Sequence, residues 1–121
     1  MDDKQTTIEE TNKMEKIMKP LENRIAIVTG AAQGIGAAIA RKLATDGATV
    51  AVADVNIAAA TKVAAECGGE SFAFATDVAE ENQVAALHAE VRKRFGRLDI
   101  LVNNAAIVPF TAWDDTDFAE W

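Results

Sequence analysis

The chain is poor in the residues that carry metal, disulfide and phenol chemistry: it has one cysteine, one histidine and no tyrosine. A single cysteine, Cys67, cannot form an internal disulfide, and no His/Cys cluster has metal-ligand spacing. No hydrophobic run reaches the length of a secretory signal or a membrane span. We therefore expect no metal site, no membrane association and a reducing, cytoplasmic location.

Positive charge is also scarce, with 12 Lys and Arg against 19 Asp and Glu, a formal net charge of -7 and a pI near 4.6. An acidic surface does not attract nucleic acid or an anionic membrane, so both are excluded as partners. An anionic cofactor remains possible, because local backbone N–H groups outweigh net charge over a few ångströms. Half of the 121 residues are hydrophobic, enough for one domain with a packed core.

Residues 1–20 are rich in Asp, Glu, Lys and Thr and are expected to form a flexible polar tail. From residue 21 to 121, short apolar runs alternate with stretches of helical periodicity. The runs predict strands at 25–28, 49–53, 71–75 and 100–102. Strands separated by helices imply parallel pairing, and hence an α/β, Rossmann-like, doubly wound sheet of order 3-2-1-4. Ligands of such sheets bind beyond the carboxyl ends of the strands.

Two helical patterns give specific expectations about burial. Ile35, Ala38, Ile39 and Leu43 recur at helical spacing and predict one apolar stripe on the first helix. His88 falls on the apolar face of a later helix, which favours a core or interface histidine over a catalytic one.

The run Thr29-Gly30-Ala31-Ala32-Gln33-Gly34-Ile35-Gly36 leaves an apolar strand and opens a helix. Pyrophosphate needs close backbone approach and a cluster of unpaired N–H donors, which glycines and a helix N-terminus supply together. The acidic Asp54 follows at the end of the next strand, 18 positions beyond Gly36. Strand, glycine loop, helix and acidic residue together predict dinucleotide binding.

Three motifs resemble those of short-chain dehydrogenases/reductases of the single-domain type. They are Thr29-Gly30-x-x-x-Gly34-Ile35-Gly36, Asp77-Val78 and Leu101-Val102-Asn103-Asn104-Ala105, and the resemblance runs from about Leu21 to the last residue. It implies an NAD(P)-dependent oxidoreductase that acts on a small alcohol or carbonyl and, when complete, forms a homo-oligomer.

The resemblance also implies a set of cofactor-binding residues. Those around the pyrophosphate and adjoining ribose would be Gly30, Gln33, Gly34, Ile35 and Gly36. Asp54 would accept hydrogen bonds from the adenosine ribose hydroxyls, and Asp77 with Val78 would read the adenine edge. Asn104, Ala105 and Ala106 would pack beside the cofactor, with Ala106 standing where glycine is usual.

The cofactor is expected to be NAD rather than NADP. A 2′-phosphate about 4 Å from the Asp54 carboxylate would be repelled by up to ~4 kcal/mol per unit charge at an effective dielectric near 20. Gln33 stands where NADP-preferring relatives often carry a basic residue, and Val55 offers no cation. Two plainer readings remain open: Asp54 as a turn residue and Asp77 as the cap of the next helix.

The resemblance further implies a catalytic tyrosine with a lysine four residues later, and no such pair exists here. The chain stops at Trp121, in what reads as the opening of another helix, so no catalytic residue is assigned. We interpret it as the cofactor-binding half of an NAD-dependent oxidoreductase, cut off after the fourth strand and inactive alone. The alternative is a non-catalytic nucleotide-binding remnant. A methyltransferase or epimerase-like protein is disfavoured by the glycine spacing and by Asn103-Asn104.

Overall fold

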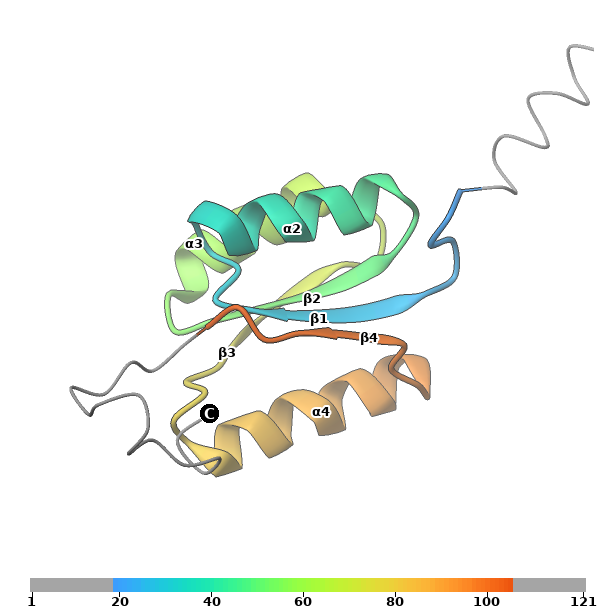
Figure 1. Ribbon diagram of the computed structural model, residues 1–121. Helices are drawn as coiled ribbons and strands as arrows, with labels where there is room; N and C mark the ends of the chain where they lie inside the picture. Colours follow the sequence, from blue (N-terminus) through green and yellow to red (C-terminus); the bar gives the residue numbers. More distant parts are fainter. Residues whose placement is uncertain (1–18, 106–121) are drawn as a thin grey trace, which may run out of the picture.

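The computed structural model describes residues 19–105, which form alternating strands and helices (Figure 1). The elements are β1 (Ile25–Thr29), α2 (Gly34–Thr45), β2 (Thr49–Asp54), α3 (Ile57–Cys67), β3 (Phe72–Ala75), α4 (Glu81–Phe95) and β4 (Ile100–Val102). Of the expected tail, only Lys19 and Pro20 belong to this part of the chain, and both are exposed.

The four strands form one parallel sheet of order β3-β2-β1-β4, as the sequence predicts. Helices α2 and α3 cover one face of the sheet and α4 covers the other (Figure 1). Because all strands run the same way, their carboxyl ends meet at one edge. The glycine loop and the residues that follow β2, β3 and β4 therefore gather at this edge.

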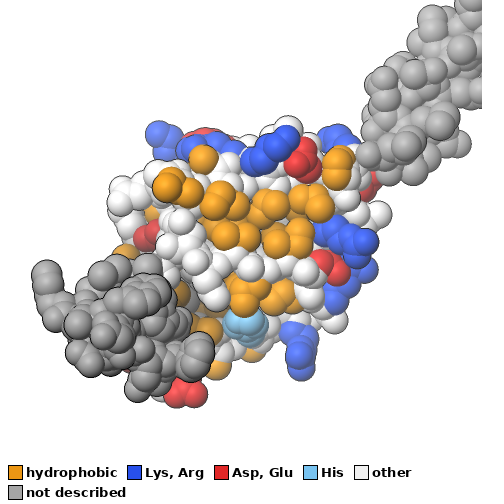
Figure 2. Space-filling view, viewed as in Figure 1, with side chains coloured by type: hydrophobic (Ala, Val, Ile, Leu, Met, Phe, Trp, Pro, Cys, Tyr) orange, Lys and Arg blue, Asp and Glu red, His pale blue; other side chains and the backbone are white. Residues whose placement is uncertain are grey.

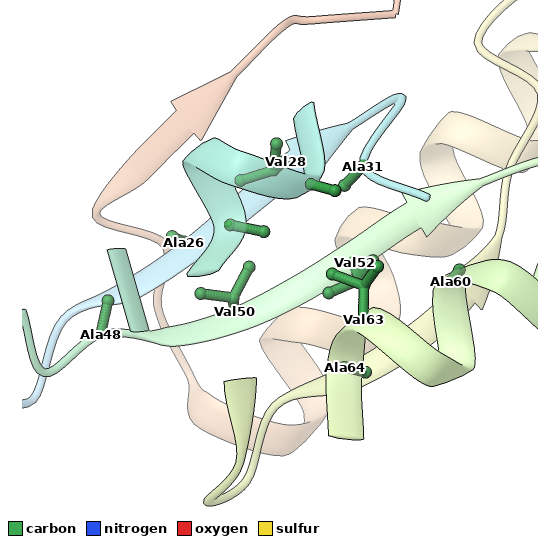
Figure 3. Packing of buried hydrophobic residues seen from close by; sticks show 11 residues of the cluster. Ala26, Val28, Ala31, Ala48, Val50, Val52, Ala60, Val63 and Ala64 are labelled. Atoms are coloured by element: carbon green, nitrogen blue, oxygen red, sulfur yellow. The ribbon is translucent and has the colours of Figure 1, made fainter. Parts of the chain in front are cut away.

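The core on the α2 and α3 face is built from small and β-branched side chains (Figure 3). Val28 in β1 and Val50 and Val52 in β2 are fully buried there, and Val63 of α3 packs onto them. Alanines fill most of the remaining positions of this cluster. Small residues let the two helices lie close against the sheet, which brings the first turn of α2 near the strand ends.

The predicted apolar stripe on α2 is wrong at two of its four positions. Ile35 is 74% exposed and Ala38 is also exposed, whereas Gly36, Ala37 and Ala40 are buried. The helix turns its smallest residues toward the sheet because it begins in close contact with the strand ends. Ile39 and Leu43 pack at the margin of the same cluster.

The opposite face of the sheet packs against α4 through larger side chains. Ile27 of β1 and Leu87 and Val91 of α4 are almost fully buried, and Phe72 of β3 joins them. His88 is exposed, so the core alternative of the prediction is wrong, while an interface role stays a prediction. One helical position beyond Leu87 is enough to turn a side chain away from the sheet.

In the described part of the chain, β4 is paired on one side only, with β1. Leu101 is 47% exposed, and Ile100 and Val102 are only partly buried. Figure 2 shows hydrophobic side chains gathered on the face between α2 and β4. No helix within residues 19–105 combines the length and apolar character needed to cross a membrane.

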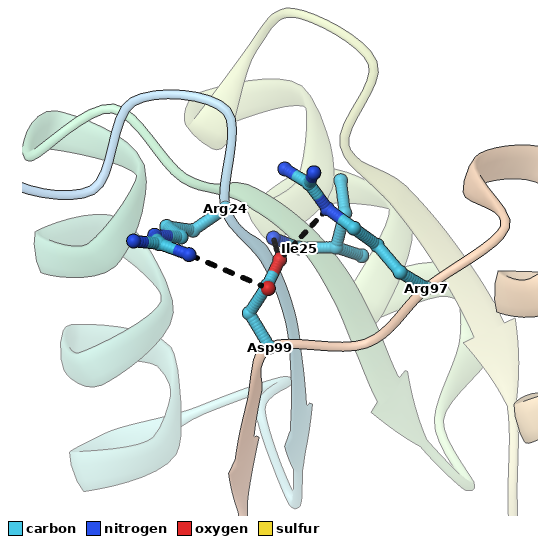
Figure 4. Close-up of polar contacts among 4 residues, drawn as sticks. All are labelled: Arg24, Ile25, Arg97 and Asp99. Atoms are coloured by element: carbon cyan, nitrogen blue, oxygen red, sulfur yellow. Dashed lines mark hydrogen bonds and ion pairs between the residues drawn. The ribbon is translucent and has the colours of Figure 1, made fainter.

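Asp99 joins β1 to β4 at the end of the sheet opposite the glycine loop (Figure 4). Its carboxylate accepts the backbone N–H of Ile25 at 2.8 Å and pairs with Arg97 at 3.2 Å and Arg24 at 3.7 Å. The Ile25 N–H, followed by the two arginines, lowers the pKa of Asp99. Charged Asp99 is thus favoured in the folded state.

The lowered pKa predicts a pH-dependent stability contribution from Asp99. It is present above the unfolded-state pKa of about 3.9 and is lost as the pH falls through the lower folded-state pKa. Asp99→Asn, which keeps an acceptor but loses the charge, is expected to lower the melting temperature at pH 7. The difference from the parent should close in acid.

Thermal melts from pH 2 to pH 8 measure this effect. Glu70→Gln is the control, because it removes one carboxylate from an exposed side chain between α3 and β3. A pH-independent difference for Asp99→Asn would contradict the role of the charge.

Candidate nucleotide-binding site

The glycine loop joins the end of β1 to the start of α2 through two left-handed backbone positions. Gly30 has φ +62° and Gly34 has φ +60°, a region that glycine occupies without steric cost. Gln33, directly before Gly34, is extended at φ -158° and is the N-cap residue of α2. The loop therefore turns twice within five residues. This places the N-terminus of α2 beside the carboxyl ends of the strands.

Two glycines allow backbone contacts that no side chain would permit. A Cβ on Gly36 would lie 2.2 Å from the carbonyl oxygen of Gly30 and 2.6 Å from Asn104 Nδ2. A Cβ on Gly30 would lie 3.0 Å from the backbone of Ala105. The first turn of α2, the loop and the residues after β4 are thus in direct contact.

The segment after β4 is hydrogen-bonded to the loop. Asn104 donates from Nδ2 to the Gly30 carbonyl oxygen at 3.1 Å, and the Ala105 N–H donates to Thr29 Oγ1 at 3.2 Å. Thr29 in turn donates to the Val102 carbonyl at 3.4 Å. Asn104 was among the predicted cofactor-binding residues, whereas the buried Thr29 hydroxyl was not predicted to take part. A hydroxyl residue closing an apolar strand, directly before the glycine, was the available signal.

The other side of the loop is hydrogen-bonded to the end of β2. The Ala31 N–H donates to the Ala53 carbonyl at 3.2 Å, and the Ala32 N–H donates to Asp54 Oδ2 at 3.1 Å. Asp54 Oδ1 accepts the N–H of Asn56 at 2.9 Å. Asp54 is therefore a turn residue, as the plainer reading had it, and it also lies beside the glycine loop.

Three further N–H groups stand at the start of α2. The first helical hydrogen bond runs from Ala37 N–H to the Gln33 carbonyl, so the N–H groups of Gly34, Ile35 and Gly36 precede it. Donors in these positions have no partner within the helix, and the helix dipole adds positive potential there. This arrangement can bind a phosphate or pyrophosphate group.

Asp77 and Val78 follow β3 at the same edge of the sheet and are partly buried. Asp77 Oδ1 accepts the N–H of Ala79 at 2.9 Å, and its own N–H donates to Gln83 Oε1 at 2.8 Å. The N-cap residue of α4 is Glu80, so the reading of Asp77 as the helix cap is wrong. Asp77 instead shapes the turn that leads to the helix.

A pocket of about 240 Å³ lies between the sheet and α4, near the strand ends. Thr29, Val78 and Asn103 border it, together with Leu87, His88 and other residues of α4 and β4. Residues at the ends of β1, β3 and β4 thus border one pocket. This pocket lies on the α4 face of the sheet, whereas α2 covers the other face. Ala106, the last of the predicted cofactor-binding residues, lies outside the described residues.

Two other kinds of reactive group are a cluster of metal-binding side chains and the thiol of Cys67. Within residues 19–105, no group of three His, Cys, Asp or Glu side chains is arranged to hold a metal ion. Burial raises the pKa of the Cys67 thiol, with Arg41 opposing and Glu66 adding to the shift. A thiol held protonated in this way is a weak nucleophile.

Residues 24–121 match the family model described as short chain dehydrogenase. The chain belongs to this family. D-threitol dehydrogenase of Mycolicibacterium smegmatis is 43% identical over 104 residues, which cover 84% of this chain and 40% of that protein. Galactitol 2-dehydrogenase of Agrobacterium fabrum is 47% identical over 87 residues, which cover 72% of this chain and 34% of that protein.

A solved short-chain dehydrogenase structure agrees with the fold. The 3-ketoacyl-(acyl-carrier-protein) reductase from Brucella melitensis, complexed with NADH, has a TM-score of 0.69 and 41% identity, and the match covers 72% of this chain and 36% of that one. The chain thus spans about two fifths or less of the length of these relatives.

The contact at Gly36 predicts that Gly36→Ala is strongly destabilising. The added methyl would lie 2.2 Å from the Gly30 carbonyl oxygen, an overlap with backbone that should cost about 3 kcal/mol or more. Gly34→Ala is the control: its Cβ would meet nothing within 4 Å, and only the left-handed φ would be strained, at about 1–2 kcal/mol. Urea unfolding of both variants measures the difference, and equal losses would contradict the packing argument.

The hydrogen bond from Asn104 to the loop predicts that substitution by aspartate destabilises the protein more at Asn104 than at Asn103. Asn104→Asp replaces a donor with a carboxylate oxygen facing the Gly30 carbonyl, which should cost about 1–3 kcal/mol in unfolding free energy. Asn103→Asp adds the same charge one residue away on an exposed side chain and should change stability little. Denaturation of the two variants at pH 7 compares them directly, and a larger loss for Asn103→Asp would refute the assignment.

Proposed function

We propose that this chain is the cofactor-binding part of an NAD-dependent oxidoreductase, formed by residues 21–121 behind a polar tail at 1–20. The observation that carries the proposal is the glycine loop, held against the ends of both neighbouring strands with the first N–H groups of α2 beyond it. When bound, the nicotinamide cofactor supplies hydride donor or acceptor chemistry. The residues described here bind and orient it.

The pyrophosphate would be held by the N–H groups of Gly34, Ile35 and Gly36, with Gly30 and Gln33 framing the loop. Two features support this role. The side chain of Ile35 is exposed, and Gly34 is exposed with nothing within 4 Å of the place where a Cβ would lie, so the start of α2 can be approached by a ligand. Ala105, in contact with Gly30, and Ala106 would border the cofactor on the β4 side.

Asp54 would accept hydrogen bonds from the adenosine ribose hydroxyls. Its two oxygens each accept one backbone N–H, which leaves lone pairs on both because a carboxylate offers about four acceptor positions. Its charge disfavours the 2′-phosphate of NADP, which supports NAD as the cofactor. Asp77 and Val78, at the end of β3, would contact the adenine.

The reaction would be hydride transfer between the nicotinamide and a small alcohol or carbonyl compound. Two relatives are named for the dehydrogenation of polyols, D-threitol and galactitol, which supports an alcohol substrate. Because the chain contains no tyrosine, we expect cofactor binding without turnover from these 121 residues alone.

Location and assembly are part of the same proposal. The single cysteine supports a cytoplasmic protein. The exposed hydrophobic side chains beside β4 favour burial against further protein surface, which supports a homo-oligomer in the complete enzyme.

Titration of the chain with NADH and NADPH tests the cofactor assignment. We expect NADH to bind at least about tenfold more tightly than NADPH, because of repulsion between Asp54 and the 2′-phosphate. Asp54→Asn should weaken NADH binding by about 10- to 100-fold, through loss of charge-assisted bonds to the ribose. Fluorescence or calorimetric titration measures each affinity.

Asp46→Asn is the matched control, since it removes one carboxylate at the far end of α2. Equal affinity for NADH and NADPH would contradict the preference for NAD. Absence of binding to either, with uptake of S-adenosylmethionine, would replace the oxidoreductase proposal with a methyltransferase.

A further inference from the structure

Asp54 makes a contact that a role in ribose recognition does not require. Its Oδ2 accepts the N–H of Ala32, 22 residues earlier in the chain and in the middle of the glycine loop. The neighbouring Ala31 N–H bonds the Ala53 carbonyl. Two successive loop N–H groups are therefore tied to the last two residues of β2, one through the backbone and one through a side chain.

We infer that Asp54 is a positioning residue for the glycine loop, and that it holds the loop in its phosphate-binding form before any cofactor arrives. The effect of this positioning role on cofactor affinity rests on the proposed function. The Ala32 N–H points to the carboxylate and is unavailable to phosphate. Fixing this N–H sets the path of the chain into Gln33 and Gly34, and thus the direction in which the first N–H groups of α2 face.

The side chain is suited to this task because it has two acceptors at the right reach. Oδ2 bonds Ala32 at 3.1 Å, while Oδ1 bonds the N–H of Asn56 at 2.9 Å and holds the carboxylate in place. Asparagine has only one acceptor oxygen, so it can satisfy one of the two N–H groups. Alanine can satisfy neither.

Removal of Asp54 should have two separate effects on phosphate binding. Loss of the negative charge by itself should strengthen the binding of any anion nearby. Loss of the contact to Ala32 should weaken phosphate binding, because the loop must then be ordered when the ligand binds. The two effects have opposite signs for a ligand that has phosphates but no ribose, and inorganic pyrophosphate is such a ligand.

The first experiment needs no cofactor. Amide hydrogen exchange of the full chain is compared in the parent, Asp54→Ala, Asp54→Asn and the control Asp46→Asn. In Asp54→Ala we expect the Ala32 amide to exchange at least about tenfold faster, with the strand amides of β1 as the internal reference. In Asp54→Asn, at least one of the Ala32 and Asn56 amides should show the same acceleration.

Unchanged exchange at Ala32 in Asp54→Ala would overturn the inference. So would acceleration that is matched by the β1 amides, because it would report general destabilisation. Should Asp54→Ala not fold, Asp54→Asn decides the question, and protection of both its amides at the parent level overturns the inference.

The second experiment titrates the same proteins with inorganic pyrophosphate. The inference predicts binding at least about threefold weaker in Asp54→Ala, which can accept neither N–H, than in Asp46→Asn, whereas charge removal alone predicts tighter binding. Equal or tighter binding in Asp54→Ala overturns the positioning role. If the parent binds neither pyrophosphate nor NADH, the proposed function fails, while the exchange result still decides whether Asp54 holds the loop.

Discussion

The structure depends on one steric constraint, the close contact of three backbone segments at the carboxyl edge of the sheet. Gly36 in the first turn of α2 lies against the Gly30 carbonyl, and Gly30 lies against the backbone of Ala105. A single methyl group at Gly36 would separate them. This contact lets a helix begin immediately over the end of a central strand, which places its unbonded N–H groups where parallel sheets bind ligands.

The loop that makes this contact is held from both sides. Asn104 and Thr29 connect it to the segment after β4, and Asp54 with Ala53 connects it to β2. These bonds use the N–H groups of Ala31 and Ala32 and leave those at the start of α2. A protein with a net charge of -7 can thus offer an anion site, because the relevant field comes from a few oriented N–H groups within a few ångströms.

Sequence patterns predicted the architecture well, but they predicted less well which individual side chains are buried. The order of strands and helices, the parallel sheet and the position of Asn104 beside the loop follow from apolar runs and motif spacing. The orientation of α2 does not, because Ile35 and Ala38 fit a helical period as well as Gly36, Ala37 and Ala40 do. His88 shows the same limit: one position along a helix separates it from the buried Leu87.

The sequence by itself determined the family and the edge of the sheet where a ligand would bind, since both depend on residue types at fixed separations. Only the tertiary structure decided which donors are already used. Whether the Ala32 N–H faces a phosphate or a carboxylate depends on how β2 lies beside the loop, and these residues are far apart in the chain. Hydrogen bonds over such separations depend on packing geometry, which a local pattern of residues does not record.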